Sequence, residues 1–361
     1  MGEVSRVTTT ADTIVIGGGV IGLCAARAIA KKGRTVVVVS EHRKGEASRA
    51  AAGMLAPSVE QSDGPAHDFA VAARDFYPDY LEDLADETGI RVPLNRLGIL
   101  QVALTEKGVK GLRKTASPAS TWLDRTQLAE LEPTLGHALG AVMNPDDGAV
   151  DNVILMSALQ ESVDKTAAIA QIEASAVSVS RDIPRVELQS GESLEADNIV
   201  IAAGAWGGMI RGADGVTAVS PCRGQLISYK TTGLRHVTYG PRGYLVPRPS
   251  GTIVAGSTME YVGFDSSTTP EGLAKVQSAA EEIAPGLAVS EITVEWAGLR
   301  PITPDMLPII GRDDGCDHLI YAAGHSRNGI LMAALTGETV AALAVGESPA
   351  HDLSQFRPGR F

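Results

Sequence analysis

Three glycines near the N-terminus have the spacing of a phosphate-binding turn. The pattern Gly17-x-Gly19-x-x-Gly22 directly follows a strand-like apolar run at residues 13–16. Gly17 permits the tight turn from strand to helix, Gly19 lets the backbone approach a pyrophosphate, and Gly22 lets the helix pack closely on the strand. The helix expected over residues 20–32 would direct its first N–H groups at the phosphate. The sequence therefore predicts a dinucleotide site.

An acidic residue follows the next predicted strand. The β-branched run at 35–39 ends just before Glu41, nineteen positions after Gly22. A carboxylate at this position accepts hydrogen bonds from a ribose diol and repels a 2′-phosphate. The alternative is an ordinary glycine-rich turn, and the pattern leaves open which dinucleotide is bound.

A segment of small side chains at residues 48–55 follows Glu46. Side chains this small do not fill a core, but they suit the surface beside a flat ring. A closely packed helix of small residues is the alternative.

Composition narrows the class of protein. The chain has 361 residues, with 31 basic against 43 acidic side chains and a formal net charge of −12. This acidic balance argues against nucleic-acid or anionic-membrane partners. Cys24, Cys222 and Cys316 are scattered, and the histidines form no i, i+4 pairs, so we expect no metal site. The same cysteine usage, with a polar segment at 1–12 that lacks an apolar signal core, favours a reducing cytoplasm.

The order of predicted elements indicates an α/β fold. Segments of nucleotide-binding type recur at the start, middle and end of the chain, with more alternating strands between them. We expect a discontinuous Rossmann-like domain and a second α+β substrate domain on a mixed or antiparallel sheet. The first would comprise residues 1–88, 145–215 and 298–361, and the second residues 89–144 and 216–297.

Two local signals concern helix boundaries. The helix expected over 67–88 contains Pro78, which predicts a kink or a restart there. Asp124 with Gln127 has the spacing of a capping box. Further helices are expected at 152–165, 270–284 and 328–345, and strands at 97–104, 198–206, 225–229, 244–247, 252–258, 292–296 and 319–324.

Several motifs in order resemble one family. They are the glycine turn, Glu41, residues 48–55 (Ser-Arg-Ala-Ala-Ala-Gly-Met-Leu), 202–206 (Ala-Ala-Gly-Ala-Trp), 298–301 (Gly-Leu-Arg-Pro) and 324–330 (Gly-His-Ser-Arg-Asn-Gly-Ile). Together they resemble FAD-dependent amine oxidases of the D-amino acid oxidase and sarcosine oxidase superfamily. Within it the chain is most similar to glycine oxidases of the thiamine-pathway type, over residues 13–337.

The resemblance implies FAD rather than NAD. It also implies oxidation of a primary or secondary amine next to a carboxylate, such as glycine, sarcosine or a small D-amino acid. Electrons would pass to oxygen, giving hydrogen peroxide and an imine that yields a keto acid and ammonia. A dehydrogenase with another acceptor, or a flavin enzyme acting on a larger amine, is the alternative.

The resemblance also implies a substrate pocket. Arg300 would hold the substrate carboxylate, for which its planar guanidinium is suited. Tyr244 would donate its hydroxyl to the same carboxylate, although a half-buried strand tyrosine is the alternative. Arg327, Met259 and Arg242 would line the pocket.

The expected cofactor contacts are spread over the whole chain. Backbone N–H groups at the helix start near Asn328 would stabilise the N1–C2=O edge of a reduced flavin, and Val177 would lie near the adenine. His325 is expected to satisfy the backbone rather than to move protons. The expected cofactor residues are Gly17, Gly19, Val20, Ile21, Gly22, Glu41, Ser48, Ala51, Ala52, Gly53, Met54, Val177, Ala203, Gly204, Trp206, Arg300, Arg327, Asn328, Gly329 and Ile330.

Two positions depart from the family pattern. Ser326 stands where glycine oxidases usually carry tyrosine, and Arg242 stands where histidine is common, so the preferred amine is left open. Residues 301–305 contain no cysteine, where relatives with covalent flavin have one. We therefore expect dissociable FAD, and the sequence is compatible with a homo-oligomer.

Overall fold

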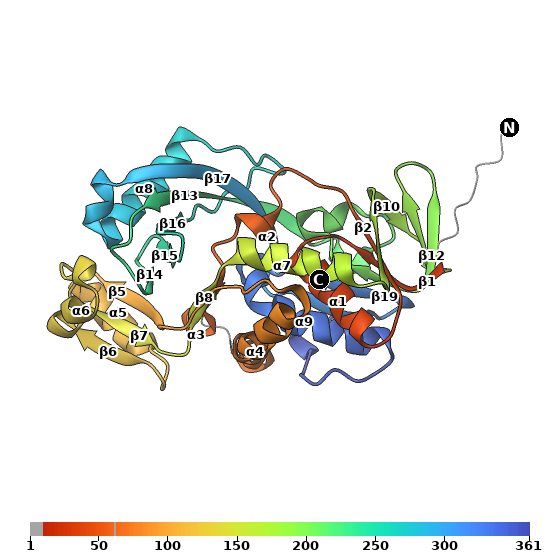
Figure 1. Ribbon diagram of the computed structural model, residues 1–361, viewed down its shortest axis with the longest axis horizontal. Coiled ribbons are helices and arrows are strands. Elements are labelled where there is room, and N and C mark those ends of the chain that lie inside the picture. Colours follow the sequence, from red (N-terminus) through yellow and green to blue (C-terminus); the bar gives the residue numbers. More distant parts are fainter. Residues whose placement is uncertain (1–9, 61–62) are drawn as a thin grey trace.

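The computed structural model describes residues 10–60 and 63–361. It contains two eight-stranded sheets and one three-stranded sheet. Figure 1 shows α1, α7 and α9 grouped with β1, β12 and β19 in one part of the molecule, and β5, β6, β7 and α8 in the other. This is the α/β architecture with a second, mixed sheet that the sequence predicts.

The first sheet is parallel at its centre. Strand β1 (Thr10–Ile16) lies between β2 (Val36–Ser40) and β12 (Ser193–Ile201), with β9 (Ile169–Glu173) beyond β2 and β19 (Cys316–Ala323) beyond β12. Alternate residues of β1 enter two separate apolar clusters, so both faces of the sheet are covered, as is typical of parallel sheets. Strands β10 (Ala176–Val179), β11 (Arg185–Leu188) and β18 (Ile309–Asp313) join it in antiparallel fashion.

Helices α1 (Val20–Lys31), α4 (Gly64–Thr88), α7 (Asn152–Lys165) and α9 (Gly329–Ala344) share one apolar core. Of the kink or restart predicted at Pro78, the restart is wrong, because α4 continues through this residue. Tyr77 and Tyr80 on either side of this proline are buried in that core. Their packing offsets the lost backbone hydrogen bond, which costs about 3 kcal/mol in an isolated helix.

The second sheet is antiparallel except where β14 and β5 pair in parallel. Its order is β17 (Glu291–Ile302), β13 (Ser220–Lys230), β16 (Thr252–Gly256), β15 (Tyr244–Arg248), β14 (Val237–Tyr239), β5 (Ile99–Ala103), β7 (Gly140–Asn144) and β6 (Thr121–Asp124). It carries α5 (Glu106–Thr115), α6 (Arg125–Leu131) and α8 (Pro270–Ile283). The predicted capping box of Asp124 and Gln127 is confirmed at the start of α6.

Short elements connect the two large sheets. Strands β3 (Met54–Leu55), β8 (Gly148–Val150) and β4 (Leu94–Asn95) form the small sheet, and α2 (Ala47–Ala50) and α3 (Pro57–Glu60) flank β3. Strand β17 crosses the predicted domain boundary at 297/298, so the assignment of residues to two domains stays a prediction. No helix among the described residues is both long enough and apolar enough to cross a membrane.

Candidate active site

The glycine turn joins β1 to α1, and two of its glycines have no room for a side chain. Gly17 has φ +118°, and a Cβ there would lie 2.3 Å from the Ala202 carbonyl oxygen. A Cβ on Gly22 would lie 1.8 Å from the Gly17 carbonyl oxygen. The first turn of α1 carries no acidic residue that would repel an anion, and its Val20 N–H donates to Ser48 Oγ at 3.0 Å.

A cavity of about 540 Å³ lies beside this turn. It borders the carboxyl ends of β1, β2 and β12, where open α/β sheets bind ligands. Gly22 is not in its wall, because that residue packs behind Gly17. The predicted cofactor residues in its wall are Gly17, Gly19, Val20, Ile21, Glu41, Ser48, Val177, Ala203, Gly204 and Trp206.

Glu41 directly follows β2 in this cavity and is held by two neighbours. Ser175 donates its hydroxyl to the Glu41 carboxylate, and the guanidinium of Arg43 lies 3.1 Å from it. Arg43 also lies over the ring of Trp206, with 5.6 Å from its Cζ to the ring centroid. Sequence reasoning missed Arg43 and Ser175, although Arg43 stands only two positions beyond Glu41.

The ladder between β10 and β11 is irregular at Val177. The register of the pairing shifts between Ala176 and Ser178, so Val177 lies at the irregularity. Its carbonyl accepts a hydrogen bond from the Arg211 N–H at 3.1 Å. The structure therefore brings Val177 to the cavity wall by way of this shift, which no sequence pattern indicated.

A second cavity, of about 420 Å³, continues from the first. Val20, Ala47 and Ser48 line both, so one extended ligand can occupy the two. The predicted residues in the wall of the second cavity are Ser48, Ala51, Ala52, Gly53, Met54, Tyr244, Met259, Arg300, Arg327, Asn328, Gly329 and Ile330.

Arg300 extends from β17 across this second cavity. Its Nη1 donates to the Thr258 carbonyl oxygen at 3.1 Å and its Nη2 to Ser257 Oγ at 2.5 Å. A Cβ on Gly224 would lie 2.3 Å from the guanidinium nitrogens, so glycine at 224 leaves the room that Arg300 occupies. Within residues 10–60 and 63–361, no carboxylate lies within 4.0 Å of Arg300. Its charge is thus available to an anionic ligand.

Two tyrosines form the wall beside Arg300. Tyr244 on β15 pairs with Tyr239 on β14, and their ring centroids are 5.7 Å apart. Burial raises the pKa of Tyr239 well above its usual value, so its hydroxyl stays protonated and can donate. Sequence reasoning missed Tyr239, which the pairing of β14 with β15 brings to this wall.

Arg327 also lines the second cavity and is already paired. Its Nε contacts the carboxylate of Glu60 on α3, whose side chain is 10% exposed. Burial raises the pKa of Glu60 and the charge of Arg327 opposes that shift. Glu60 therefore balances the charge of Arg327, and nothing in the sequence indicated this partner.

The N-terminus of α9 also borders the second cavity. The helix begins at Gly329, and neither an acidic side chain in its first turn nor a side-chain cap on Asn328 is present. The first N–H groups of a helix carry a partial positive charge of about half an elementary charge. This end of α9 can therefore stabilise negative charge that develops on a ligand in the cavity.

Arg242 is not brought to this cavity. Its Nε lies 2.7 Å from Glu282 Oε2 on α8, and its Nη2 donates to Ser278 Oγ at 3.2 Å. Arg242 borders a separate depression of about 310 Å³, which meets the second cavity at Met259 and its neighbours. Met259 is 50% exposed at this edge.

The placement of Arg242 gives a prediction. Replacing Arg242 with methionine should change kcat/KM for the substrate by less than about threefold, because an exposed ion pair contributes only about 0–1 kcal/mol. Steady-state kinetics of the purified variant measure this. A loss of a hundredfold would show that Arg242 reaches the substrate after all.

His325 is buried beside the first cavity. Burial lowers the pKa of His325 from 6.5 to about 3, and its Nε2 lies 3.2 Å from Thr336 Oγ1. The imidazole is therefore neutral at ordinary pH. Its hydrogen-bond partner is a threonine hydroxyl, and not the backbone group that the sequence predicts.

The depressed pKa of His325 predicts a pH dependence of stability. Below pH 6.5 the unfolded chain binds a proton that the folded chain excludes, so the free energy of unfolding falls as the pH drops toward 3. Between pH 7.5 and 5.5 this group should remove about 1 kcal/mol. Denaturant unfolding of the wild type and of His325→Gln at both pH values measures it. Equal pH dependence in the two proteins would contradict the prediction.

Among the described residues, no three His, Cys, Asp or Glu side chains group as a metal site. Cys24, Cys222 and Cys316 are free and buried.

The sequence model for the family described as FAD dependent oxidoreductase matches residues 12–343. The chain belongs to this FAD-dependent oxidoreductase family. The expectations of FAD and of the α/β fold are thereby confirmed, and so is the resemblance to glycine oxidases, through the relatives below.

Three known proteins show the extent of the likeness. A glycine oxidase of Bacillus licheniformis is 35% identical, with 93% of each chain covered. The crystal structure of glycine oxidase from Geobacillus kaustophilus superposes with a TM-score of 0.91 at 30% identity, covering 98% of this chain and 100% of that one. The bifunctional protein ThiO/ThiG of Synechocystis sp. is 34% identical over 98% of this chain. The chain spans only 54% of that relative's length.

The two cavities fit the cofactor of this family. Gly17 and Gly22 provide a turn that side chains would block, and the N-terminus of α1, which has no acidic residue in its first turn, faces the space for the pyrophosphate. Glu41 stands where a ribose diol binds. The wall of the second cavity includes the small residues from Ala51 to Gly53, which leave room for the flavin ring, and the N-terminus of α9.

Proposed function

We propose that this oxidoreductase oxidises glycine or a similarly small amine that carries an α-carboxylate, with oxygen as the electron acceptor. The observation that carries the proposal is Arg300, a cation without a carboxylate partner among the described residues, in the cavity that also fits the flavin ring. The names of the relatives, glycine oxidases at 31–35% identity, support the same substrate class.

The residues of the second cavity have separate roles in binding and orienting the substrate. Arg300 binds the substrate carboxylate through its two forked N–H groups, and Tyr244 supplies a further hydroxyl donor. Fixing the carboxylate orients the α C–H bond toward the flavin side of the cavity, which is the main requirement of the reaction. The N-terminus of α9 stabilises negative charge on that side.

Bound FAD would supply the two-electron chemistry, as acceptor of a hydride from the α carbon and as donor of both electrons to oxygen, which would leave as hydrogen peroxide. The amine becomes an imine, and water converts the imine to a keto acid and ammonia. For glycine the keto acid is glyoxylate.

The size of the cavity favours small substrates. About 420 Å³ must hold both the flavin ring and the substrate, and the two tyrosine rings close one wall. Ser326, a small residue, lines the same cavity and leaves room for an N-alkyl group. This observation supports sarcosine as a second substrate, with a larger amine as the alternative.

Hydrogen peroxide production tests the proposal. The purified, FAD-saturated protein is incubated in air with glycine, sarcosine, D-alanine and D-proline separately, and peroxide and keto acid are measured together. Equal amounts of both products with at least one of the four support an amino acid oxidase. Dye reduction without peroxide would favour a dehydrogenase, and no turnover of any of the four would favour another amine.

We also propose how the cofactor is held, what the partners are and where the protein is located. FAD is bound without a covalent link, since residues 301–305 offer no cysteine. A small-molecule substrate and oxygen are the proposed partners, with neither nucleic acid nor membrane involved, and a homo-oligomer is compatible with this. A cytoplasmic location and a role in the thiamine pathway are proposed on the cysteine usage and on the likeness to glycine oxidases and ThiO/ThiG.

A further inference from the structure

The segment from Ser48 to Gly53, which lines the second cavity, is held by donors from distant parts of the chain. Five of its six carbonyl oxygens accept a hydrogen bond from outside the segment. Asn152 Nδ2 donates to Ser48 at 2.9 Å and to Arg49 at 3.2 Å, Trp296 Nε1 to Ala50 at 2.9 Å, Arg248 Nη2 to Ala52 at 3.0 Å, and the Val150 N–H to Gly53 at 2.8 Å.

These donors lie behind the segment. None of the four donor residues lines the second cavity, whereas Ala50, Ala52 and Gly53 do. The bonds therefore turn the carbonyl oxygens away from the cavity. The face that the segment presents to a flavin ring therefore lacks these carbonyl oxygens. Carbonyl oxygens pointing into the cavity would repel negative charge on the ring.

The two side-chain donors that come from the second sheet share strands with the substrate residues. On β15, Tyr244 and Arg248 are four positions apart and on one face; on β17, Trp296 and Arg300 have the same relation. Four residues of a strand span about 13 Å. Each strand thus carries one residue at the substrate and one that donates a hydrogen bond to the Ser48–Gly53 segment.

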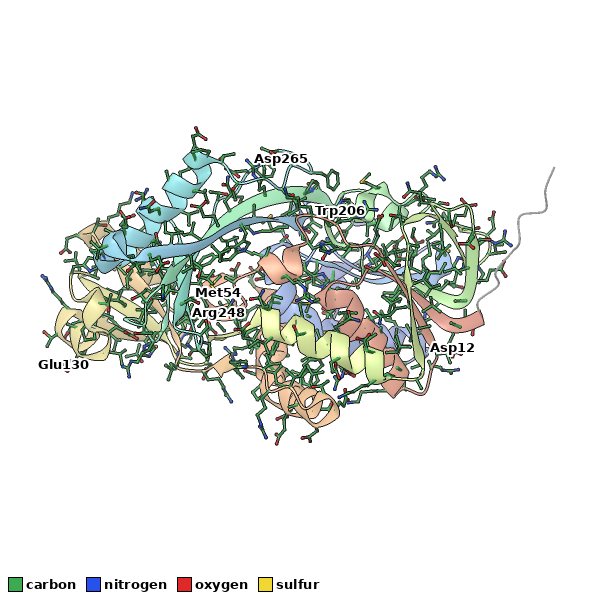
Figure 2. The ribbon with its side chains drawn as sticks, turned by 45° about the horizontal axis from the view of Figure 1, so that its top comes forward. Asp12, Met54, Glu130, Trp206, Arg248 and Asp265 are labelled. Atoms are coloured by element: carbon green, nitrogen blue, oxygen red, sulfur yellow. The ribbon has the colours of Figure 1, made fainter. Side chains whose placement is uncertain are left out.

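Arg248 makes more hydrogen bonds in this region than Trp296 does. It also donates to the Val150 carbonyl at 2.9 Å and to Asn152 Oδ1 at 2.6 Å, so it ties the segment to two residues behind it. Within the described chain, no carboxylate lies within 4.0 Å of its guanidinium, and burial lowers its pKa. Burying a cation without an ionic partner is costly, and its three hydrogen bonds to neutral oxygens offset this. Figure 2 labels Arg248 and also Met54, the residue that follows this segment.

We propose that Arg248 and Trp296 are positioning residues that fix the Ser48–Gly53 segment, and with it the flavin ring, relative to Arg300 and Tyr244. The second sheet carries Arg248 and Trp296 as well as the substrate residues. It therefore sets the distance between the substrate α carbon and the flavin. The substrate roles of Arg300 and Tyr244 rest on the proposed function, whereas the hold of Arg248 and Trp296 on the segment does not.

The test uses Arg248→Met, Arg248→Lys and Trp296→Phe in the full-length protein. FAD affinity is measured by titrating the apoprotein, and the rate of flavin reduction is measured anaerobically at saturating glycine and saturating FAD. We expect Arg248→Met to weaken FAD binding and to slow flavin reduction by about tenfold to a hundredfold each, since small misplacements cost this much. Trp296→Phe, which keeps the ring and loses one donor, should slow reduction by about threefold to tenfold.

Two readouts separate positioning from general damage. Acetate binding, followed by the flavin spectrum, should stay within about twofold of the wild type in all variants, because Arg300 still holds the carboxylate. Arg248→Lys should recover only part of the rate, since an ammonium lacks the fork that reaches three acceptors. The matched control is Arg235→Met. Arg235 is exposed and, like Arg248, borders a third hollow of about 260 Å³, but it donates to the Leu131 carbonyl.

Two results would overturn the proposal. The first is wild-type FAD affinity and wild-type flavin reduction in both Arg248→Met and Trp296→Phe. The second is an equal loss of acetate binding, reduction rate and melting temperature, which would show that these residues only support the fold. If the wild type is reduced by no small amine, the proposed function fails, while the FAD titration still decides whether Arg248 positions the segment.

Discussion

Replacing Arg300 with alanine is expected to lower kcat/KM for glycine by roughly 10²- to 10⁴-fold, about 3–5 kcal/mol of transition-state binding. Arg300 is the cation of the second cavity that no carboxylate balances among the described residues, and its partners Ser257 and Thr258 are neutral. Removing it leaves the substrate carboxylate in a cavity without a matching charge. Steady-state kinetics with peroxide detection measure the loss.

The controls for this prediction separate charge from geometry. Arg300→Lys should recover part of the activity, because an ammonium restores the charge without the forked donors. FAD content of Arg300→Ala should match the wild type. Arg113→Ala removes an exposed arginine on α5, far from the cavity walls, and should leave kcat/KM unchanged. An Arg300→Ala enzyme with wild-type kcat/KM would exclude Arg300 as the carboxylate anchor.

Replacing Gly22 with alanine is expected to abolish stable FAD binding, raising the dissociation constant for FAD by about a hundredfold or more. A Cβ at this position would lie 1.8 Å from the Gly17 carbonyl oxygen and 3.4 Å from Val15 Cγ1. The start of α1 must therefore move away from β1, which displaces the N–H groups that face the pyrophosphate. Displacing packed elements in this way also costs about 1–3 kcal/mol of stability.

The ratio of flavin to protein absorbance in the purified protein, followed by FAD titration, measures this effect. Gly111→Ala is the matched control, because Gly111 lies in α5 with no atom within 4 Å of the added methyl group. This control should bind FAD normally and gain up to about 1 kcal/mol of stability. A Gly22→Ala protein that is purified with a full complement of FAD would contradict the structural account of the turn.

Local signals predicted the parts of the site that lie close together in sequence. The glycine turn, the position of Glu41 after β2 and the capping box at Asp124 each depend on a few neighbouring residues. Arg300 and Tyr244 were expected together only through resemblance, and the structure brings both to one cavity.

The parts that sequence could not reveal are long-range pairings. Glu60 and Arg327 are 267 positions apart, and no pattern in either segment indicates the partner. Arg248 contacts the Ala52 carbonyl 196 positions away. Arg242 precedes β15 in a loop, where its direction is set by packing against α8 rather than by strand alternation.

The most direct test of the account is to mix the FAD-saturated protein with glycine in the absence of oxygen, record the flavin spectrum, and then admit air. The account predicts that the flavin absorbance bleaches, that it recovers in air with one peroxide formed per flavin, and that Arg300→Ala bleaches far more slowly at the same glycine concentration. A flavin that stays oxidised with glycine, and equally with sarcosine, D-alanine and D-proline, would contradict the assignment of this cavity to small amino acids.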